Sequence, residues 1–124
     1  MESVELPNAT TIGNSAFFYS TALTSVNLPN ATTIDGAAFS QCSALTSVNL
    51  PNATTIGEAV FFKCSALTSI NLPKVTSIGV NAFKNISSTA VINIGAAEGE
   101  IEGAPWGAPE GVTINYNVTT STSA

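Results

Sequence analysis

The residues of this 124-residue chain that could do chemistry are few, and the clearest group is three glutamates. Glu98, Glu100 and Glu102 alternate along the chain, so an extended segment would present their carboxylates on one side. Calcium requires about six to eight oxygen ligands, and neither an EF-hand spacing nor an aspartate-rich repeat supplies the remainder. A solvated acidic loop is therefore preferred over a metal site, and no metal or other cofactor is expected.

The sequence offers no recognisable catalytic group. It contains no histidine, which excludes a histidine-based triad, a histidine-ligated metal and a histidine general base. It also lacks a P-loop and a dinucleotide-binding fingerprint. Nothing sets one carboxyl group in an apolar environment and leaves another hydrated, as a paired-carboxylate hydrolase requires. We therefore expect a protein that is not an enzyme.

The two cysteines are the remaining reactive groups. Cys42 and Cys64 lie 22 residues apart and occupy equivalent positions in a repeat. Stacked strands are about 4.8 Å apart, a separation that a disulfide tolerates, but equivalent side chains point in parallel directions. Two buried, reduced thiols that pack as small hydrophobic side chains are expected.

The elements that would position these groups are repeats of 22 residues. The segment Leu23–Ile34, LTSVNLPNATTI, recurs letter for letter at Leu45–Ile56. A period of this length is the signature of a solenoid, whose coils bury their apolar faces against one another. Two apolar columns, two residues apart, predict a strand with both columns facing the core. The columns are Val4, Val26, Val48, Ile70 and Ile92, and then Leu6, Leu28, Leu50, Leu72 and Ile94.

The rest of each repeat is predicted to turn and return. A proline, which cannot donate to a ladder, ends each of the first four strands at Pro7, Pro29, Pro51 and Pro73. A second extended piece and a phenylalanine position complete the buried set. The small residues before the phenylalanines favour a short 3-10 turn. These columns are Ile12, Ile34, Ile56 and Ile78, and then Phe17, Phe39, Phe61 and Phe83.

The segment LTSVNLPNATTIGEAVFFKCSA, residues 45–66, resembles the BspA-like leucine-rich repeats in its leucines, Leu-Pro, Ile-Gly, phenylalanine and cysteine. The resemblance covers four copies within residues 1–88, although Ser20 and Ile86 stand where the family often has cysteine. It implies a mainly β fold, a right-handed leucine-rich-repeat solenoid with parallel β-strand ladders and short 3-10 turns. Members of this family are largely bacterial surface proteins that adhere to host proteins or to other cells. The resemblance therefore also implies an adhesive function and an extracellular or cell-surface location.

The C-terminal part departs from the repeat but keeps its period. Residues 89–118 are expected to form a degenerate fifth coil, a loop rich in glycine and proline, and a capping strand at 112–116. Trp106 in the loop is expected to cover the last coil, because a lone aromatic residue beside a core is usually packed. The predicted cap comprises Trp106, Ile114 and Tyr116, and residues 119–124 are predicted to be a disordered tail.

Charge and hydropathy narrow the range of partners. Three basic and eight acidic residues give a net charge of −5, which argues against binding to nucleic acid or an anionic membrane. No apolar run approaches the roughly 18 residues of a membrane-spanning helix, so membrane insertion is not expected. The first residues contain no signal-peptide pattern, so a surface location would require a signal elsewhere or a larger assembly.

The first coil has no polar cap before Ser3 in this sequence. An uncovered coil exposes strand edges and core side chains, which invites pairing. A homo-oligomer formed through this N-terminal coil is one expectation. The other expectation is that the chain was cut from, or recombined out of, a longer array of repeats, whose preceding coil would have covered this one.

One candidate binding face is the outer side of the strands. A column of asparagines there is expected to hydrogen-bond along itself. The alternative is a shallow, uncharged face for a glycan or an extended peptide. The face comprises Ser25, Asn27, Ser47, Asn49, Ser69, Asn71, Asn93 and Asn115.

A second candidate is the opposite face, where nearly identical repeats differ. Such differences indicate tolerated change or a surface that a partner recognises. At one repeat position the residues are Phe18, Ser40, Phe62 and Lys84, and at the next they are Tyr19, Gln41, Lys63 and Asn85. The candidate variable residues among them are Phe18, Tyr19, Gln41, Phe62, Lys63 and Lys84.

Three functional interpretations follow. The preferred one is a non-enzymatic interaction or adhesion module that binds a protein partner, either a host or cell-surface protein or another subunit. The second is a structural subunit of a larger assembly, phage-tail-like or self-associating through the N-terminal coil. The third is a carbohydrate-binding module that uses the asparagine and serine face.

Overall fold

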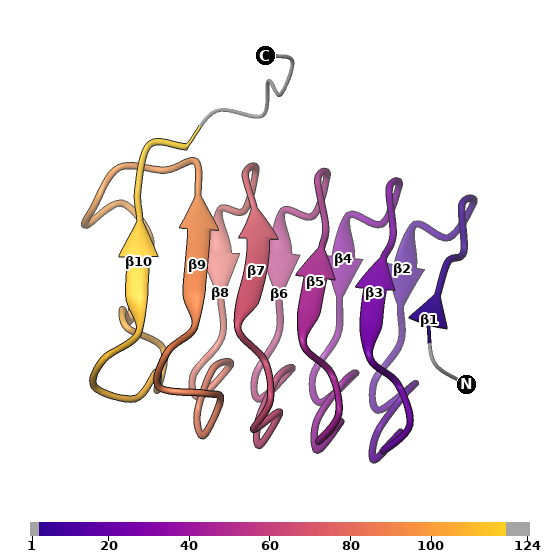
Figure 1. Cartoon of the computed structure of the whole chain (residues 1–124). Coiled ribbons are helices and arrows are strands. Elements are labelled where there is room, and N and C mark those ends of the chain that lie inside the picture. Colours follow the sequence, from indigo (N-terminus) through magenta and orange to yellow (C-terminus); the bar gives the residue numbers. More distant parts are fainter. Residues whose placement is uncertain (1–2, 119–124) are drawn as a thin grey trace.

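The 22-residue repeat folds into the coils of a β-solenoid of about five turns (Figure 1). The computed structural model describes residues 3–118, so the predicted tail at 119–124 lies outside the described residues. Two parallel sheets run along the solenoid. The six-stranded sheet contains β1 (Ser3–Val4), β3 (Ser25–Asn27), β5 (Ser47–Asn49), β7 (Ser69–Leu72), β9 (Val91–Ile94) and β10 (Thr113–Asn115). The four-stranded sheet contains β2 (Thr11–Ile12), β4 (Thr33–Ile34), β6 (Thr55–Ile56) and β8 (Ser77–Ile78).

The register of both sheets follows the sequence period. Val26 pairs with Val48, and Val48 with Ile70, each one repeat apart. In the second sheet, Ile34 pairs with Ile56 in the same way. Each paired strand residue therefore stacks on its equivalent in the next coil, which confirms the predicted parallel ladders.

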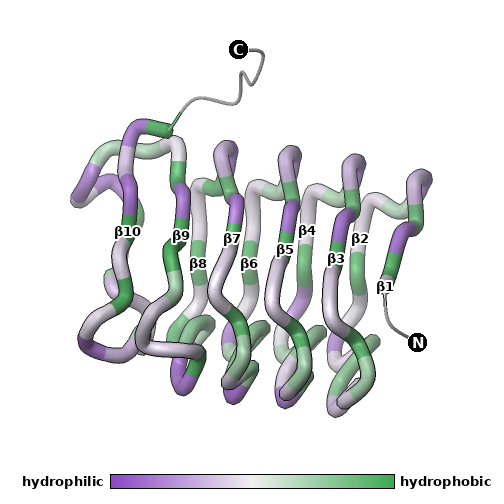
Figure 2. Tube along the Cα trace, viewed as in Figure 1, coloured by the Kyte–Doolittle hydropathy of each residue, from purple (hydrophilic) through white to green (hydrophobic). Residues whose placement is uncertain are grey.

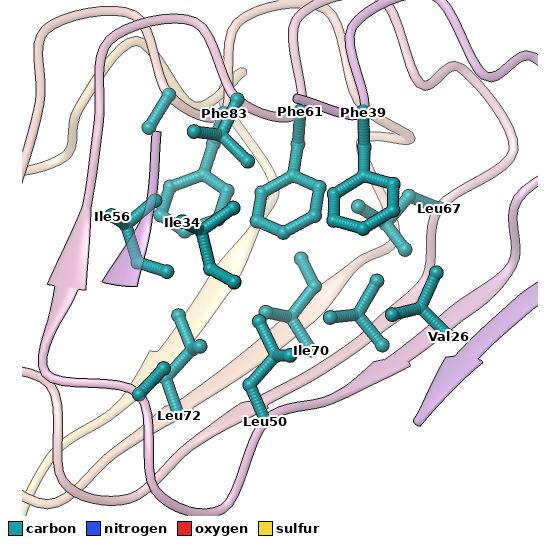
Figure 3. Packing of buried hydrophobic residues seen from close by; sticks show 14 of the residues in the cluster. Val26, Ile34, Phe39, Leu50, Ile56, Phe61, Leu67, Ile70, Leu72 and Phe83 are labelled. Carbon is teal, nitrogen blue, oxygen red and sulfur yellow. The ribbon is translucent and has the colours of Figure 1, made fainter. Parts of the chain in front are cut away.

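The predicted apolar columns form the core. Val26, Leu28, Leu50 and Ile70 are almost completely buried. Figure 3 shows the strand side chains and the phenylalanines of several coils meeting in one interior, and Figure 2 shows the apolar residues recurring at the same level in successive coils. Leu6 in the first coil is 42% exposed, because no strand of the described chain lies beyond β1.

The phenylalanines form a continuous stack along the solenoid. The ring centroids are 5.3 Å apart between Phe17 and Phe39, 6.0 Å between Phe39 and Phe61, and 5.8 Å between Phe61 and Phe83. The planes deviate from parallel by at most 5°. Centroid separations above 5 Å between parallel rings indicate offset stacking, which aromatic quadrupoles prefer.

The segment between the second strand and the phenylalanine differs in detail from the 3-10 turn expected there. Ala16 and Phe18 donate amide hydrogens to carbonyls three residues back, but Ser15 and Phe17 donate to Gly36 and Ala38 of the next coil. Positive φ angles recur at two positions per repeat, near 60° at Ser15 and at Tyr19. The segment therefore forms separate hydrogen-bonded turns and not a continuous 3-10 helix. Every second amide bonds to the next coil, and a residue with left-handed backbone would interrupt a helix.

The described residues contain no helix with the length and apolar character needed to cross a bilayer.

Candidate functional site

The variable face of the solenoid contains a shallow hollow of about 300 Å³, called here the turn groove. Its lining side chains come from four successive coils and occupy two equivalent positions in the repeat, so the groove follows the solenoid axis. They are Tyr19, Thr21, Gln41, Ser43, Lys63, Ser65 and Asn85. The structure thus brings together three predicted variable residues, Tyr19, Gln41 and Lys63.

The backbone explains why these side chains project outward. Tyr19, Gln41, Lys63 and Asn85 all have φ angles of 60° to 63°. Tyr19 N–H donates to the Ser40 carbonyl at 2.8 Å, and Lys63 N–H to the Lys84 carbonyl at 2.9 Å. A left-handed conformation costs an ordinary residue about 1 kcal/mol or more, and these inter-coil bonds offset that cost. The strain belongs to the repeat itself, since Ser15, outside the groove, shows it as well.

Aromatic rings flank the turn groove. Phe18 is 48% exposed and Tyr19 is 63% exposed, with ring centroids 6.3 Å apart. Two coils on, the Lys63 ammonium lies 5.3 Å from the centre of the Phe62 ring. Among residues 3–118, Lys63 is the only charged residue that lines the groove. The surface therefore offers aromatic area and one cation, a combination that suits protein contacts.

Ser40 and Lys84 lie at the same repeat position as Phe18 and Phe62. Lys84 is exposed, as expected of the variable face. The sequence placed Ser40 on that face too, but only 3% of its surface is accessible. The small Ser40 side chain lies between Phe18 and Phe62, the larger residues at the equivalent positions of the two adjacent coils, and is covered. Ser40 therefore does not belong to the accessible surface.

On the strand face, the asparagines hydrogen-bond to one another as expected. The Asn49 amide donates to the Asn27 side-chain oxygen at 3.0 Å, and the Asn71 amide donates to Asn49 at 2.8 Å. Asn115 likewise donates to Asn93 at 2.9 Å. This bonding uses one N–H donor and one acceptor lone pair of Asn49, and its second N–H and second lone pair are not used by it. The hollow on this face that Asn27 lines, with Glu5, Pro7 and Pro29, holds about 140 Å³.

The serines beside this asparagine column differ in exposure. Ser25 and Ser47 are half-buried and Ser69 is exposed.

The two cysteines are free and buried, as predicted. The Cys42 thiol contacts the Phe17 carbonyl oxygen at 3.2 Å, and the Cys64 thiol contacts the Phe39 carbonyl oxygen at 3.0 Å. Hydrogen bonding with the Cys64 sulfur lowers the pKa of Cys42. Hydrogen bonding with the Cys42 sulfur, and then burial, raises the pKa of Cys64. A raised pKa keeps the thiol protonated at neutral pH, and the thiol is far less nucleophilic than the thiolate.

Because both thiols are buried, they are expected to resist a thiol reagent such as DTNB in the native protein and to react rapidly in denaturant. Thiol titration with and without guanidinium measures this difference. A native mass two units below that of the dithiol would instead reveal a disulfide.

The C-terminal loop buries two side chains against the last coils. Trp106 is 1% exposed, and its ring meets Phe83 edge-on at 6.1 Å and 74°. Its indole N–H donates to the Glu102 carbonyl at 2.8 Å. Ile101, 6% exposed, is also part of the core. Sequence reasoning missed Ile101, although an isolated isoleucine among glycines and glutamates was the available signal.

The remaining predicted cap residues lie on or beside the last strand. The strand expected at 112–116 corresponds to β10 (Thr113–Asn115), which pairs with β9 so that Ile114 lies opposite Ile92. Ile114 and Tyr116 are half-buried and pack against the core. This geometry supports a capping role for Trp106, Ile114 and Tyr116.

The three alternating glutamates are all exposed. Glu100 accepts a hydrogen bond from the Ala97 amide at 2.9 Å. Within residues 3–118, no group of three or more histidine, cysteine, aspartate or glutamate side chains is arranged to hold a metal ion. Glu98, Glu100 and Glu102 are a solvated acidic surface in this structure.

Comparison with known families yields one match. The pattern described as BspA type leucine rich repeat region matches residues 1–103 in six copies. It extends past the four copies recognised within residues 1–88 and into the C-terminal loop. Neither the curated proteins nor the solved structures contain a match to the chain.

Proposed function

Because the chain belongs to the BspA-type leucine-rich-repeat family, we propose that it is a non-enzymatic adhesion module whose turn groove contacts a protein partner. Leucine-rich repeats of this family suggest protein interaction or adhesion and are generally non-enzymatic. The family is typically associated with surfaces, which supports an extracellular or bacterial cell-surface location for this chain.

The observation that carries this proposal is the variation of the side chains along one hollow. Tyr19, Gln41, Lys63 and Asn85 occupy equivalent positions in four successive coils and line the turn groove, yet all four differ. The asparagine column, by contrast, is constant from Asn27 to Asn115. Variation also occurs at a second set of equivalent positions outside the groove, Asn14, Gly36, Glu58 and Val80. A surface that varies on a constant scaffold can acquire a specific partner without loss of the fold.

The side chains of the turn groove indicate the kind of partner. Tyr19 and Phe18 provide exposed aromatic surface of the type that dominates interface energetics. Lys63 adds one positive charge, and no carboxylate lines the groove. A protein segment with an apolar residue next to an acidic one fits this surface best.

Selection of a phage-displayed random peptide library against the chain tests the turn groove. Selected peptides are expected to bind with a Kd raised about tenfold or more by Tyr19→Ala combined with Lys63→Ala, because hot-spot truncations typically cost over 1 kcal/mol each. Asn27→Ala combined with Asn49→Ala on the strand face is the matched control and should leave the Kd unchanged. Peptides that lose binding only in the control variant would contradict the proposal.

The two other functions have narrower support. A glycan site on the strand face has to compete with the asparagine-to-asparagine hydrogen bonds, and a glycan array tests it directly. A structural subunit that associates through the N-terminal coil is supported by the exposed Leu6 beside the outer strand β1. Light scattering of the purified chain distinguishes this arrangement from a monomeric adhesin.

A further inference from the structure

The four-stranded sheet ends before the six-stranded sheet does. The larger sheet continues through β9 and β10, whereas β8 has only β6 as a neighbour within the described chain (Figure 1). In each inner coil, three backbone amides donate to two carbonyls of the preceding coil across this sheet. In the third coil, Thr54 and Thr55 donate to the Thr32 carbonyl at 2.9 Å and 3.2 Å, and Gly57 donates to the Ile34 carbonyl at 2.8 Å.

The same acceptors are vacant at the outer edge of β8. By the repeat, the carbonyls equivalent to those of Thr32 and Ile34 are those of Thr76 and Ile78. Neither accepts a hydrogen bond from any residue between 3 and 118. An exposed strand edge of this kind is a template for pairing with another extended chain.

Space for such a chain exists beside β8. A hollow of about 380 Å³ is lined by Thr76, Ser77, Ile78, Glu100, Ile101 and Glu102. A second hollow of about 300 Å³ shares Thr76, Glu100 and Ile101 with the first. Val75 and Ala96 also line the second hollow. The strand edge thus forms one wall and the C-terminal loop forms another. Ile78 and Ile101 line the floor of the first hollow but are only 7% and 6% exposed, so little apolar surface is open to an occupant.

The charge beside this edge has one sign. The loop over residues 95–111 carries four of the eight acidic residues of the chain and none of its three basic residues. Glu100 and Glu102 are exposed, and no ion pair involves them within residues 3–118. Two uncompensated carboxylates beside vacant carbonyl acceptors favour a positively charged occupant that donates hydrogen bonds.

We propose that the outer edge of β8 binds an extended basic segment of a partner protein as a fifth strand. Two amides of the segment donate to the Thr76 and Ile78 carbonyls, as Ser77 and Gly79 do to the Thr54 and Ile56 carbonyls one coil further in. The residue between these amides points inward, as Ile78 does, and is small, because Ile78 and Ile101 already fill the core there. The flanking residues point outward and are lysine or arginine, facing Glu100 and Glu102. This is strand addition, in which main-chain bonds provide affinity and alternate side chains provide specificity.

This site is separate from the turn groove, because no residue lines both hollows. Failure of either proposal therefore leaves the other standing.

Fluorescence anisotropy with a labelled peptide of alternating lysine and alanine tests the strand-addition site on the full chain. We expect saturable binding whose Kd rises about fivefold or more in the double variant Glu100→Gln with Glu102→Gln. The matched control, Glu98→Gln with Glu110→Gln, removes the same charge from the same loop outside the hollow and should have a much smaller effect. Thermal melts of both variants check that the fold is retained.

A second probe separates strand addition from simple charge attraction. The same peptide methylated on its lysine amide nitrogens keeps its charge but cannot donate the two main-chain hydrogen bonds, and we expect its Kd to rise about tenfold or more. Equal binding of the two peptides, equal effects of the two double variants, or no saturable binding would each overturn the proposal. Loss of peptide binding in the Tyr19→Ala and Lys63→Ala double variant would also overturn it, because the peptide would then bind in the turn groove.

Discussion

Replacement of Leu50 by alanine is expected to lower the free energy of unfolding by about 2 to 5 kcal/mol. Leu50 is completely buried in a central coil, beside Ile70 and Leu72 of the next coil (Figure 3). The loss combines the transfer energy of the removed methyl groups with the cost of a cavity that neighbouring coils cannot fill. Chemical denaturation followed by circular dichroism measures the change.

The neighbouring residue provides the control for this measurement. Asn49→Ala removes one donor and one acceptor from the asparagine column on the outside of the same strand. Because these hydrogen bonds exchange with water, the expected loss is about 1 kcal/mol. Equal losses at the two positions would mean that the column stabilises the solenoid as much as the core does.

Trp106→Ala is expected to destabilise the C-terminal coils by about 3 to 5 kcal/mol, within the range for a buried aromatic residue truncated to alanine. The indole covers the end of the phenylalanine stack at Phe83 and bonds the Glu102 carbonyl. In a solenoid each coil contacts only its neighbours, so the loss should begin at this end and spread inward. Hydrogen exchange should therefore rise first in β8 and β9, and less in β3 and β5.

Trp106→Phe is the matched variant for this prediction. It keeps an aromatic ring against Phe83 but loses the indole N–H, so its loss should be clearly smaller than that of alanine. If exchange rose uniformly over all strands in Trp106→Ala, the solenoid would unfold as one cooperative unit and the tryptophan would not act as a local cap.

Much of the fold followed from the repeat alone. The identity of Leu23–Ile34 and Leu45–Ile56 means that the two coils have the same conformation and stack in register. Alternation within each coil then identified Val26 and Leu28 as inward and Asn27 as outward, because side chains of a strand alternate between its faces. The free state of Cys42 and Cys64 followed from the same parallel stacking.

The candidate sites were less accessible to this reasoning. The variable positions could be read from the sequence. Their assembly into one groove depends on left-handed backbone at Tyr19, Gln41 and Lys63, and these residue types do not predict a positive φ angle. Ser40 was misplaced because its exposure depends on its neighbours in adjacent coils. Ile101 was missed because the repeat pattern ends before it.

The amino-acid sequence by itself determined the solenoid, its register, its core columns and its mostly uncharged surface, since these depend on interactions that recur every 22 residues. Only the tertiary structure decided how the last coil is closed. The larger sheet gains β9 and β10 while the smaller one ends at β8, and the loop leaves hollows between Ile78 and Glu100. A repeated sequence specifies how each coil packs on, and hydrogen-bonds to, the next coil. The geometry of its last coil depends on how a unique loop packs, and no periodicity encodes that packing.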